Sequence, residues 1–218
     1  MRLLLVIVAS AAGASAGEFF VGAMGGVTTL SGDARTVGAP PAQFSAYKPE
    51  NGPGARVFAG RHFHDYFSAQ VSYAWNRNRV ALSGGDVGAA ASYELPMRAR
   101  MDTVVAEGMV YFRRPSSRVR PYLSAGPGVS MLRATATGPL LVRGSAAAPG
   151  QRIEASKIAL RVAVGIDVRI AGSFWLRYSF SETLQRNALS RGLRPPGMRN
   201  LANFQNWWGA SWRFWGSI

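Results

Sequence analysis

Two histidines, His62 and His64, stand two residues apart in the chain. Residues i and i+2 share one face of an extended strand, so this pair could begin a metal site. Asp65 is the only carboxylate beside them, and histidines near a turn are usually solvated. The chain has no cysteine, which excludes thiolate metal sites, thiol nucleophiles and disulfides. We expect no metal site and no cofactor.

Nucleophilic catalysis by serine would need a histidine base beside the serine. Neither His62 nor His64 begins a His-x-Ser sequence. Serines and glutamates are plentiful, but we expect none of them to have a histidine partner. The sequence therefore predicts a protein that is not an enzyme.

Arginine dominates the charge of the chain. Lys and Arg number 25 against 11 Asp and Glu, and Lys48 and Lys157 are the only lysines. The arginines are scattered among Gly-rich loops and strand ends, and they form no helix stripe and no aromatic RNA-binding motif. For a chain that begins like an exported protein, we therefore expect anionic lipid head groups rather than nucleic acid as the partner, and arginine would bind their phosphates in a fork.

The elements that position these charges are predicted to be β-strands, because the sequence alternates with a period of two residues. From Phe204 to Phe214, alternate residues are mostly apolar and aromatic, whereas the residues between them are mostly polar or small. Seven earlier segments alternate in the same way, and clusters of Gly, Pro, Ser and Asn separate them. The eight expected strands are 18–30, 54–63, 66–82, 97–113, 121–137, 153–170, 174–187 and a last one from residue 203.

The connections between these strands alternate long and short. Long loops are expected at 31–53, 83–96, 138–152 and 188–202, and tight turns at 64–65, 114–120 and 171–173. This layout, with an even strand number, is typical of an all-β, eight-stranded antiparallel up-and-down transmembrane β-barrel. A soluble secreted ligand-binding barrel is the alternative, since it shows the same alternation. One arginine, Arg61, would face lipid, either near the interface or at a bulge.

Several charges fall on the face opposite the apolar one and would lie inside the barrel. An eight-stranded barrel is just wide enough to be filled by side chains, and buried charges must pair. We expect a structural salt-bridge network; the excess of arginine leaves a small anion-preferring pore as an alternative. The predicted network is Arg56, Glu107, Arg161, Asp167, Arg169, Arg177 and Arg213, with Glu18 as a further acid.

The chain begins like an exported protein. Arg2, the apolar run 3–8 and the small residues 14–16 have the pattern of a signal peptide over residues 1–16. The run is too short to span a bilayer as a helix. Residues 17–218 would then form one barrel domain.

The chain resembles the eight-stranded outer-membrane barrels of the outer-membrane protein A and X kind. The local matches are Gly209, Trp212 and Phe214, which look like the C-terminal signal for the assembly machinery, and the segment 120–129 with its Pro-Tyr-x-x-x-Gly-x-Gly pattern. The resemblance implies a monomeric protein of the bacterial cell outer membrane with a structural or surface-interaction role. Its partners would be outer-membrane lipid, lipopolysaccharide and the assembly machinery. Separately, the loop arginines Arg191, Arg194 and Arg199 predict either a solvated basic rim or a contact with the phosphates of lipopolysaccharide or another polyanion.

Overall fold

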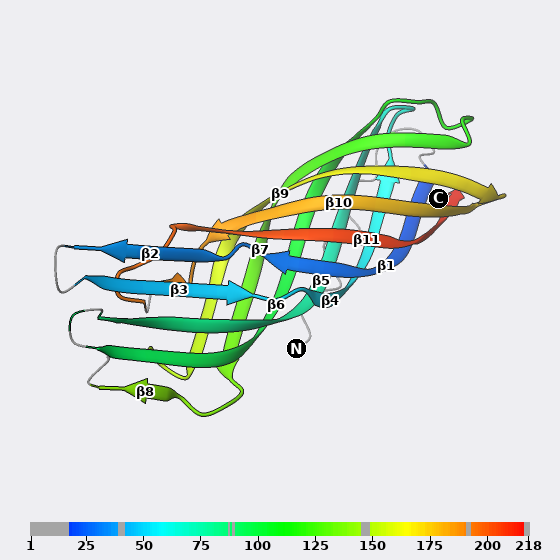
Figure 1. The fold of residues 1–218 in the computed structure, drawn as a ribbon. Coiled ribbons are helices and arrows are strands. Elements are labelled where there is room, and N and C mark those ends of the chain that lie inside the picture. Colours follow the sequence, from blue (N-terminus) through cyan, green and yellow to red (C-terminus); the bar gives the residue numbers. More distant parts are fainter. Residues whose placement is uncertain are drawn as a thin grey trace.

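The computed structural model describes residues 18–38, 42–86, 88, 90–144, 149–190 and 193–215. These residues form one antiparallel sheet that closes on itself (Figure 1). The signal peptide predicted over residues 1–16 and the predicted contact residue Arg191 lie outside the described residues. Among the described residues, no helix is long and apolar enough to cross a membrane.

Eight strands make the closed ring, which confirms the predicted barrel. The ring closes where β1 pairs with both β4 and β11, and its opposite side is joined by the long β5–β6 pair. Its strands are β1 (Glu18–Leu30), β4 (Gly52–His62), β5 (Phe67–Asp86), β6 (Ala91–Tyr111), β7 (Val119–Ala136), β9 (Arg152–Ala171), β10 (Phe174–Arg186) and β11 (Asn200–Trp215).

Three further strands extend the sheet at the end with the long connections, which we call the outer end. β2 (Asp33–Val37) and β3 (Gln43–Pro49) form a hairpin, and β3 pairs with the outer part of β5. β8 (Leu141–Arg143) pairs with the start of β6. The hairpin β2–β3 and the strand β8 project from the ring on the same side in Figure 1.

Three of the expected long loops are therefore wrong in part. Residues 138–152 contain β8. Residues 31–53 contain the β2–β3 hairpin, and residues 83–96 belong largely to β5 and β6, which pair as far as Asp86 and Ala91. The turn-like composition around Ser83-Gly-Gly led to the loop prediction. Continued pairing satisfies the backbone N–H and C=O groups of these residues.

Burial alternates along every ring strand, with one face turned inward and one outward. Arg61 lies on the outward face without a bulge, since its pairings with Phe19 and Ala69 are in register with their neighbours. Its guanidinium lies 5.2 Å from the centre of the Phe19 ring and 5.8 Å from that of Phe63. These aromatic rings belong to the end of the barrel with the short turns, which we call the inner end.

Inward-facing side chains form two clusters. At the outer end, the cluster consists of aliphatic side chains and methionines with Tyr47 and Tyr93. At the inner end, aromatic rings dominate, and two of them depend on glycine: Phe20 is paired with Gly60, and Phe58 with Gly22. A Cβ at either glycine would lie 2.3 Å from a ring atom, so only glycine lets the rings lie across the neighbouring strand.

Candidate functional site in the barrel interior

The Arg177 side chain is the hub of the inner half of the barrel interior. It projects from β10 and is buried. Its Nε and Nη2 atoms donate to the two carboxylate oxygens of Asp167 at 2.6 and 2.8 Å. Nη1 donates to Gln70 Oε1 at 3.0 Å, and Nη2 also donates to the Tyr111 hydroxyl at 3.0 Å. A bidentate pair of this kind is the strongest arginine–carboxylate arrangement.

Aromatic rings enclose the same guanidinium. Its central carbon lies 5.3, 4.6 and 5.1 Å from the ring centres of Phe20, Phe58 and Tyr122. These distances are within the range of cation–π attraction. Arg177 is thus hydrogen-bonded at its edge and packed at its faces, and it occupies the centre of the barrel.

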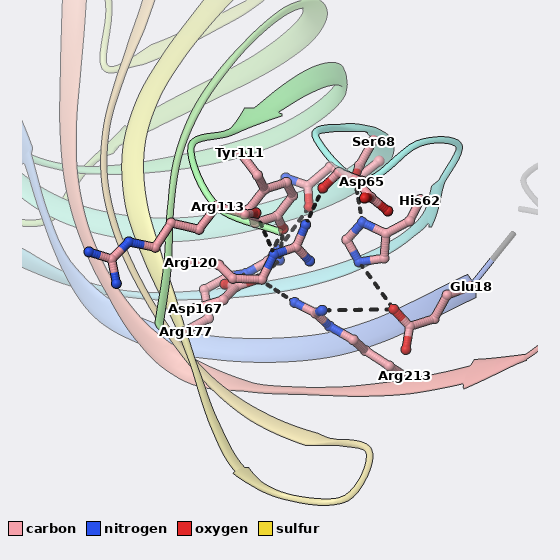
Figure 2. Close-up of polar contacts among 11 residues, drawn as sticks. Glu18, His62, Asp65, Ser68, Tyr111, Arg113, Arg120, Asp167, Arg177 and Arg213 are labelled. Atoms are coloured by element: carbon pink, nitrogen blue, oxygen red, sulfur yellow. Dashed lines mark hydrogen bonds and ion pairs between the residues drawn. The ribbon is translucent and has the colours of Figure 1, made fainter. Parts of the chain in front are cut away.

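Asp167 joins three strands. Besides the two bonds from Arg177, its Oδ2 accepts from Arg213 Nη2 at 2.9 Å and from the Tyr111 hydroxyl at 2.9 Å (Figure 2). Arg213 Nη1 lies 3.8 Å from Glu18 Oε2. One buried carboxylate on β9 therefore connects the last strand of the barrel, β11, with β10 and β6.

Glu107 is the centre of a second group of charges. Its Oε2 accepts from Arg56 Nη2 at 2.5 Å and from Gln70 Nε2 at 2.6 Å, and its Oε1 lies 3.4 Å from Arg161 Nε. Gln70 bridges the two groups, because its amide nitrogen donates to Glu107 and its amide oxygen accepts from Arg177. The two groups therefore form one connected network.

Six of the seven predicted network residues have no more than 2% of their surface exposed: Arg56, Glu107, Arg161, Asp167, Arg177 and Arg213. The prediction for Arg169 is wrong, since this residue is exposed. The β9–β10 register shifts between Phe174 and Trp175, at the end of the ladder. There Arg169 lies outside the network, with its guanidinium carbon 5.9 Å from the Trp175 ring centre.

Arg120 joins the inner end of the network, and its predicted place in the turn 114–120 is wrong, because it belongs to β7. It is fully buried, lies 4.0 Å from the centre of the Tyr111 ring and donates to the Asp65 carbonyl at 2.7 Å. The sequence pattern could have indicated this position. Tyr122 lies on the inward face, and Arg120, two residues before it, lies on the same face of an extended strand.

The prediction that no serine or glutamate has a histidine partner is also wrong. His62 Nδ1 hydrogen-bonds the Ser68 hydroxyl, and Nε2 lies 3.9 Å from Glu18 Oε2 (Figure 2). These are the three residue types of a nucleophilic triad. However, Ser68 is 4% exposed and His62 7%, whereas a nucleophile must be reached by its substrate. The contact therefore supports the barrel wall rather than a reaction.

The two histidines do not share a face. His62 is the last residue of β4 and points inward, whereas His64 lies exposed in the following turn. Among the described residues, no group of three or more histidines and carboxylates is placed to hold a metal ion.

The outer half of the interior is filled by the connection between β10 and β11. Its residues Ala188, Leu189 and Leu193 are buried and pack with Leu82 and Leu95 of the outer cluster. No residue of this outer cluster is charged. The described part of this connection, residues 187–190 and 193–199, is called the plug segment below.

Polar contacts hold the plug segment to the β2–β3 hairpin. Asn187 Nδ2 donates to the Tyr47 hydroxyl at 2.7 Å, and burial raises the pKa of that hydroxyl. Ser45 Oγ donates to the Pro195 carbonyl at 2.5 Å, and the Met198 N–H donates to Asp33. The hairpin thus fixes the segment that closes the outer half.

Four further predicted site residues, Arg194, Arg199, Trp212 and Phe214, lie on the surface, whereas Gly209 lies on the inward face of β11. Arg194 and Arg199 are exposed on the plug segment. On β11, Trp212 and Phe214 are 55% and 42% exposed on the outward face near the inner end. Gly209 lies on the same strand, where a Cβ would be 2.0 Å from the Ala23 carbonyl oxygen.

Comparison with known proteins gives one matching family and several solved structures of similar fold. The sequence profile described as outer membrane protein beta-barrel domain matches residues 2–214. No curated protein sequence matches the chain. The crystal structure of neisserial surface protein A is similar, with a TM-score of 0.51 and 14% identity over 90% of this chain and 97% of that one.

Two further solved structures are similar over most of their length. Ail, the attachment invasion locus protein of Yersinia pestis, solved with the heparin analogue sucrose octasulfate, has a TM-score of 0.47 and 15% identity, covering 92% of this chain and 100% of that one. OprG of Pseudomonas aeruginosa has a TM-score of 0.48 and 12% identity, covering 91% and 96%. At such identities the likeness concerns the fold alone.

Proposed function

Because this chain belongs to the outer membrane protein beta-barrel domain family and is a protein of the bacterial outer membrane, we propose that it is a non-enzymatic envelope protein that works through its outer end. The observation that carries the proposal is the filled interior. The Arg177 network fills the inner half, and the plug segment fills the outer half. What the protein contacts must then be contacted at its surface.

The outer end offers an ordered surface for such contacts. β5 and β6 pair as far as Asp86 and Ala91, β3 and β8 add to their edges, and the plug segment is hydrogen-bonded to the hairpin. A surface that is ordered before binding loses little conformational entropy when a partner docks. We place this end outside the cell, with the short turns in the periplasm, as is usual for such barrels.

The proposed partners at this end are lipopolysaccharide and other polyanions, through Arg191, Arg194 and Arg199. A variant with these three arginines replaced by serine should bind immobilised lipopolysaccharide more weakly than the unaltered protein. The matched control replaces Arg113, Arg114 and Arg118, three exposed arginines next to a turn at the inner end. Equal binding by both variants would end this part of the proposal.

A small anion-preferring pore is the second candidate. Five buried arginines, Arg56, Arg120, Arg161, Arg177 and Arg213, face three acids, Glu18, Glu107 and Asp167. This excess of positive charge favours anions. The experiment is conductance in a planar bilayer, with a boiling-dependent gel shift to show that the protein is folded. We expect no steady channel; a steady anion-selective current from folded protein would make the pore the better reading.

The proposal has two further parts that follow from the family. Gly209, Trp212 and Phe214 would be read by the outer-membrane assembly machinery, and the folded protein would be a monomer. Light scattering in detergent tests the second part, and the assembly rate of a Phe214→Ser variant tests the first.

A further inference from the structure

Four outward arginines form a square midway along the β5–β6 pair. On β5, the outward side chains are apolar or aromatic from Phe67 to Trp75, and the next two are Arg77 and Arg79. Arg77 is paired across the strands with Arg100, and Arg79 with Arg98. All four are exposed. We call Arg77, Arg79, Arg98 and Arg100 the arginine quartet.

The quartet is electrostatically unfavourable by itself. Like charges directly opposite on neighbouring strands destabilise a sheet. Asp102 forms a salt bridge with Arg100, with Oδ2 2.9 Å from Nε. Glu50 forms a longer one with Arg79, with Oε2 3.9 Å from Nη1. Among the described residues, no acid forms a salt bridge with Arg77 or Arg98. The square therefore carries more positive than negative charge, and an anion from outside would complete it.

The next strand continues the same row. Arg133 on β7 is paired with Arg100 and is itself bonded to Glu154, with Nε 2.6 Å from Oε1. Arginine thus occupies one registered line across three neighbouring strands, with an acid only on the fourth.

This line lies where the apolar outward face ends. On β7 the outward face is apolar from Leu123 to Met131, immediately before Arg133, and on β5 Trp75 immediately precedes Arg77. The Arg77 guanidinium lies 5.3 Å from the Trp75 ring centre. Aromatic side chains of this kind mark the membrane–water interface, so the quartet lies at the level of the head groups.

We propose that the arginine quartet binds the phosphate groups of the lipid A part of lipopolysaccharide. Guanidinium groups bind phosphate in bidentate fashion. Directly opposite residues on neighbouring strands are about 5 Å apart, and alternate residues on one strand about 7 Å, so the long side chains of the quartet can reach the same phosphate group. Arg77 and Arg98 would supply the forks, because the Nε–Nη2 edge of Arg100 is bonded to Asp102. This inference deepens the proposed function, since it rests on the outer end facing the outer leaflet.

The test measures lipid retained by the full chain in detergent by native mass spectrometry. The quartet variant replaces all four arginines with glutamine. The matched control replaces Arg113, Arg114, Arg118 and Arg169, four exposed arginines at the inner end. Loss of the fork contacts should weaken lipid A binding at least about tenfold in the quartet variant, and the control should bind like the unaltered protein. A gel shift on boiling shows that each protein is folded.

A second measurement needs no variant. The unaltered protein should bind lipid A stripped of its phosphates at least about tenfold more weakly than intact lipid A. Equal binding of both lipids, or equal binding by the quartet and control variants, would overturn the inference. Equal binding of phosphatidylglycerol and lipid A would also overturn it, because the site would then take any anionic lipid. A channel found in the conductance experiment would end the proposed function and leave this result standing.

Discussion

The inner half of the barrel interior is joined by arginine–carboxylate hydrogen bonds, whereas the outer half is joined by packed aliphatic side chains. In the inner half every partner of Arg177 projects from a strand of the ring. In the outer half three residues of the aliphatic cluster come from the plug segment, which lies between the ring strands β10 and β11. The first arrangement is directional and fails if one partner is lost. The second depends on volume and tolerates repacking.

The largest expected effect comes from removing one charge of the inner half. Asp167→Asn should lower the free energy of unfolding by about 3–5 kcal/mol, because Arg177 and Arg213 would be left buried without their carboxylate. Urea unfolding in lipid vesicles, followed by tryptophan fluorescence, measures it. Asp65→Asn is the control, since Asp65 lies exposed in the turn after β4. A loss below about 1 kcal/mol would show that the network does not need this charge.

A cavity in the outer half should cost somewhat less. Leu95 is fully buried in the outer cluster, and Leu95→Ala should lower the free energy of unfolding by about 3 kcal/mol through lost burial and the cavity left behind. Leu141 is 59% exposed, so Leu141→Ala serves as the control. If Leu95→Ala costs more than Asp167→Asn, aliphatic packing rather than the charge network dominates the stability of this barrel.

The smallest effect should follow from loosening the plug segment. Asn187→Ala removes the bond to Tyr47 and the two bonds that Asn187 Oδ1 accepts from the N–H groups of Leu189 and Ser190. We expect the free energy of local opening of the plug segment to fall by about 1 kcal/mol. Trypsin should then cleave after Arg199 faster than in the unaltered protein. Asn51→Ala, at an exposed asparagine, is the control, and equal cleavage of both variants would show that Asn187 does not hold the segment.

The ring of eight strands could be predicted because each strand by itself shows an apolar face and a polar or small-residue face. The inward position of Arg177 follows from period two, without knowledge of its neighbours. Its partners did not follow, because Gln70, Tyr111 and Asp167 come from different strands and meet only once the ring is closed.

One missed contact shows how sensitive such predictions are to register. A turn at residues 64–65 would pair Phe63 with Tyr66 and His62 with Phe67. The structure pairs His62 with Ser68 instead. A slip of one residue changes every partner across a hairpin. The same sensitivity at strand ends explains why Arg120 and Arg169, both next to turns, were assigned to the wrong surroundings.

The arginine quartet was missed for a different reason. Each of its members reads as a scattered surface charge along the sequence. Only the pairing of β5 with β6 places Arg77 opposite Arg100 and Arg79 opposite Arg98. Alternation identifies the face of a strand, but the juxtaposition of charges across strands needs the register.

The seam between β1 and β11 sets an order of events in the life of the chain. It pairs Glu18 with Trp215, the first and last described residues, and Arg213 on the last strand supplies one of the two guanidinium groups bound to Asp167. Contacts between such distant residues form late and slowly, because the intervening chain must first be brought together. The charge of Asp167 is therefore fully compensated only after β11 has been synthesised and exported. A chain truncated before β11 would lack both the strand that closes the ring and the second guanidinium group bound to Asp167, so it could not form the closed barrel.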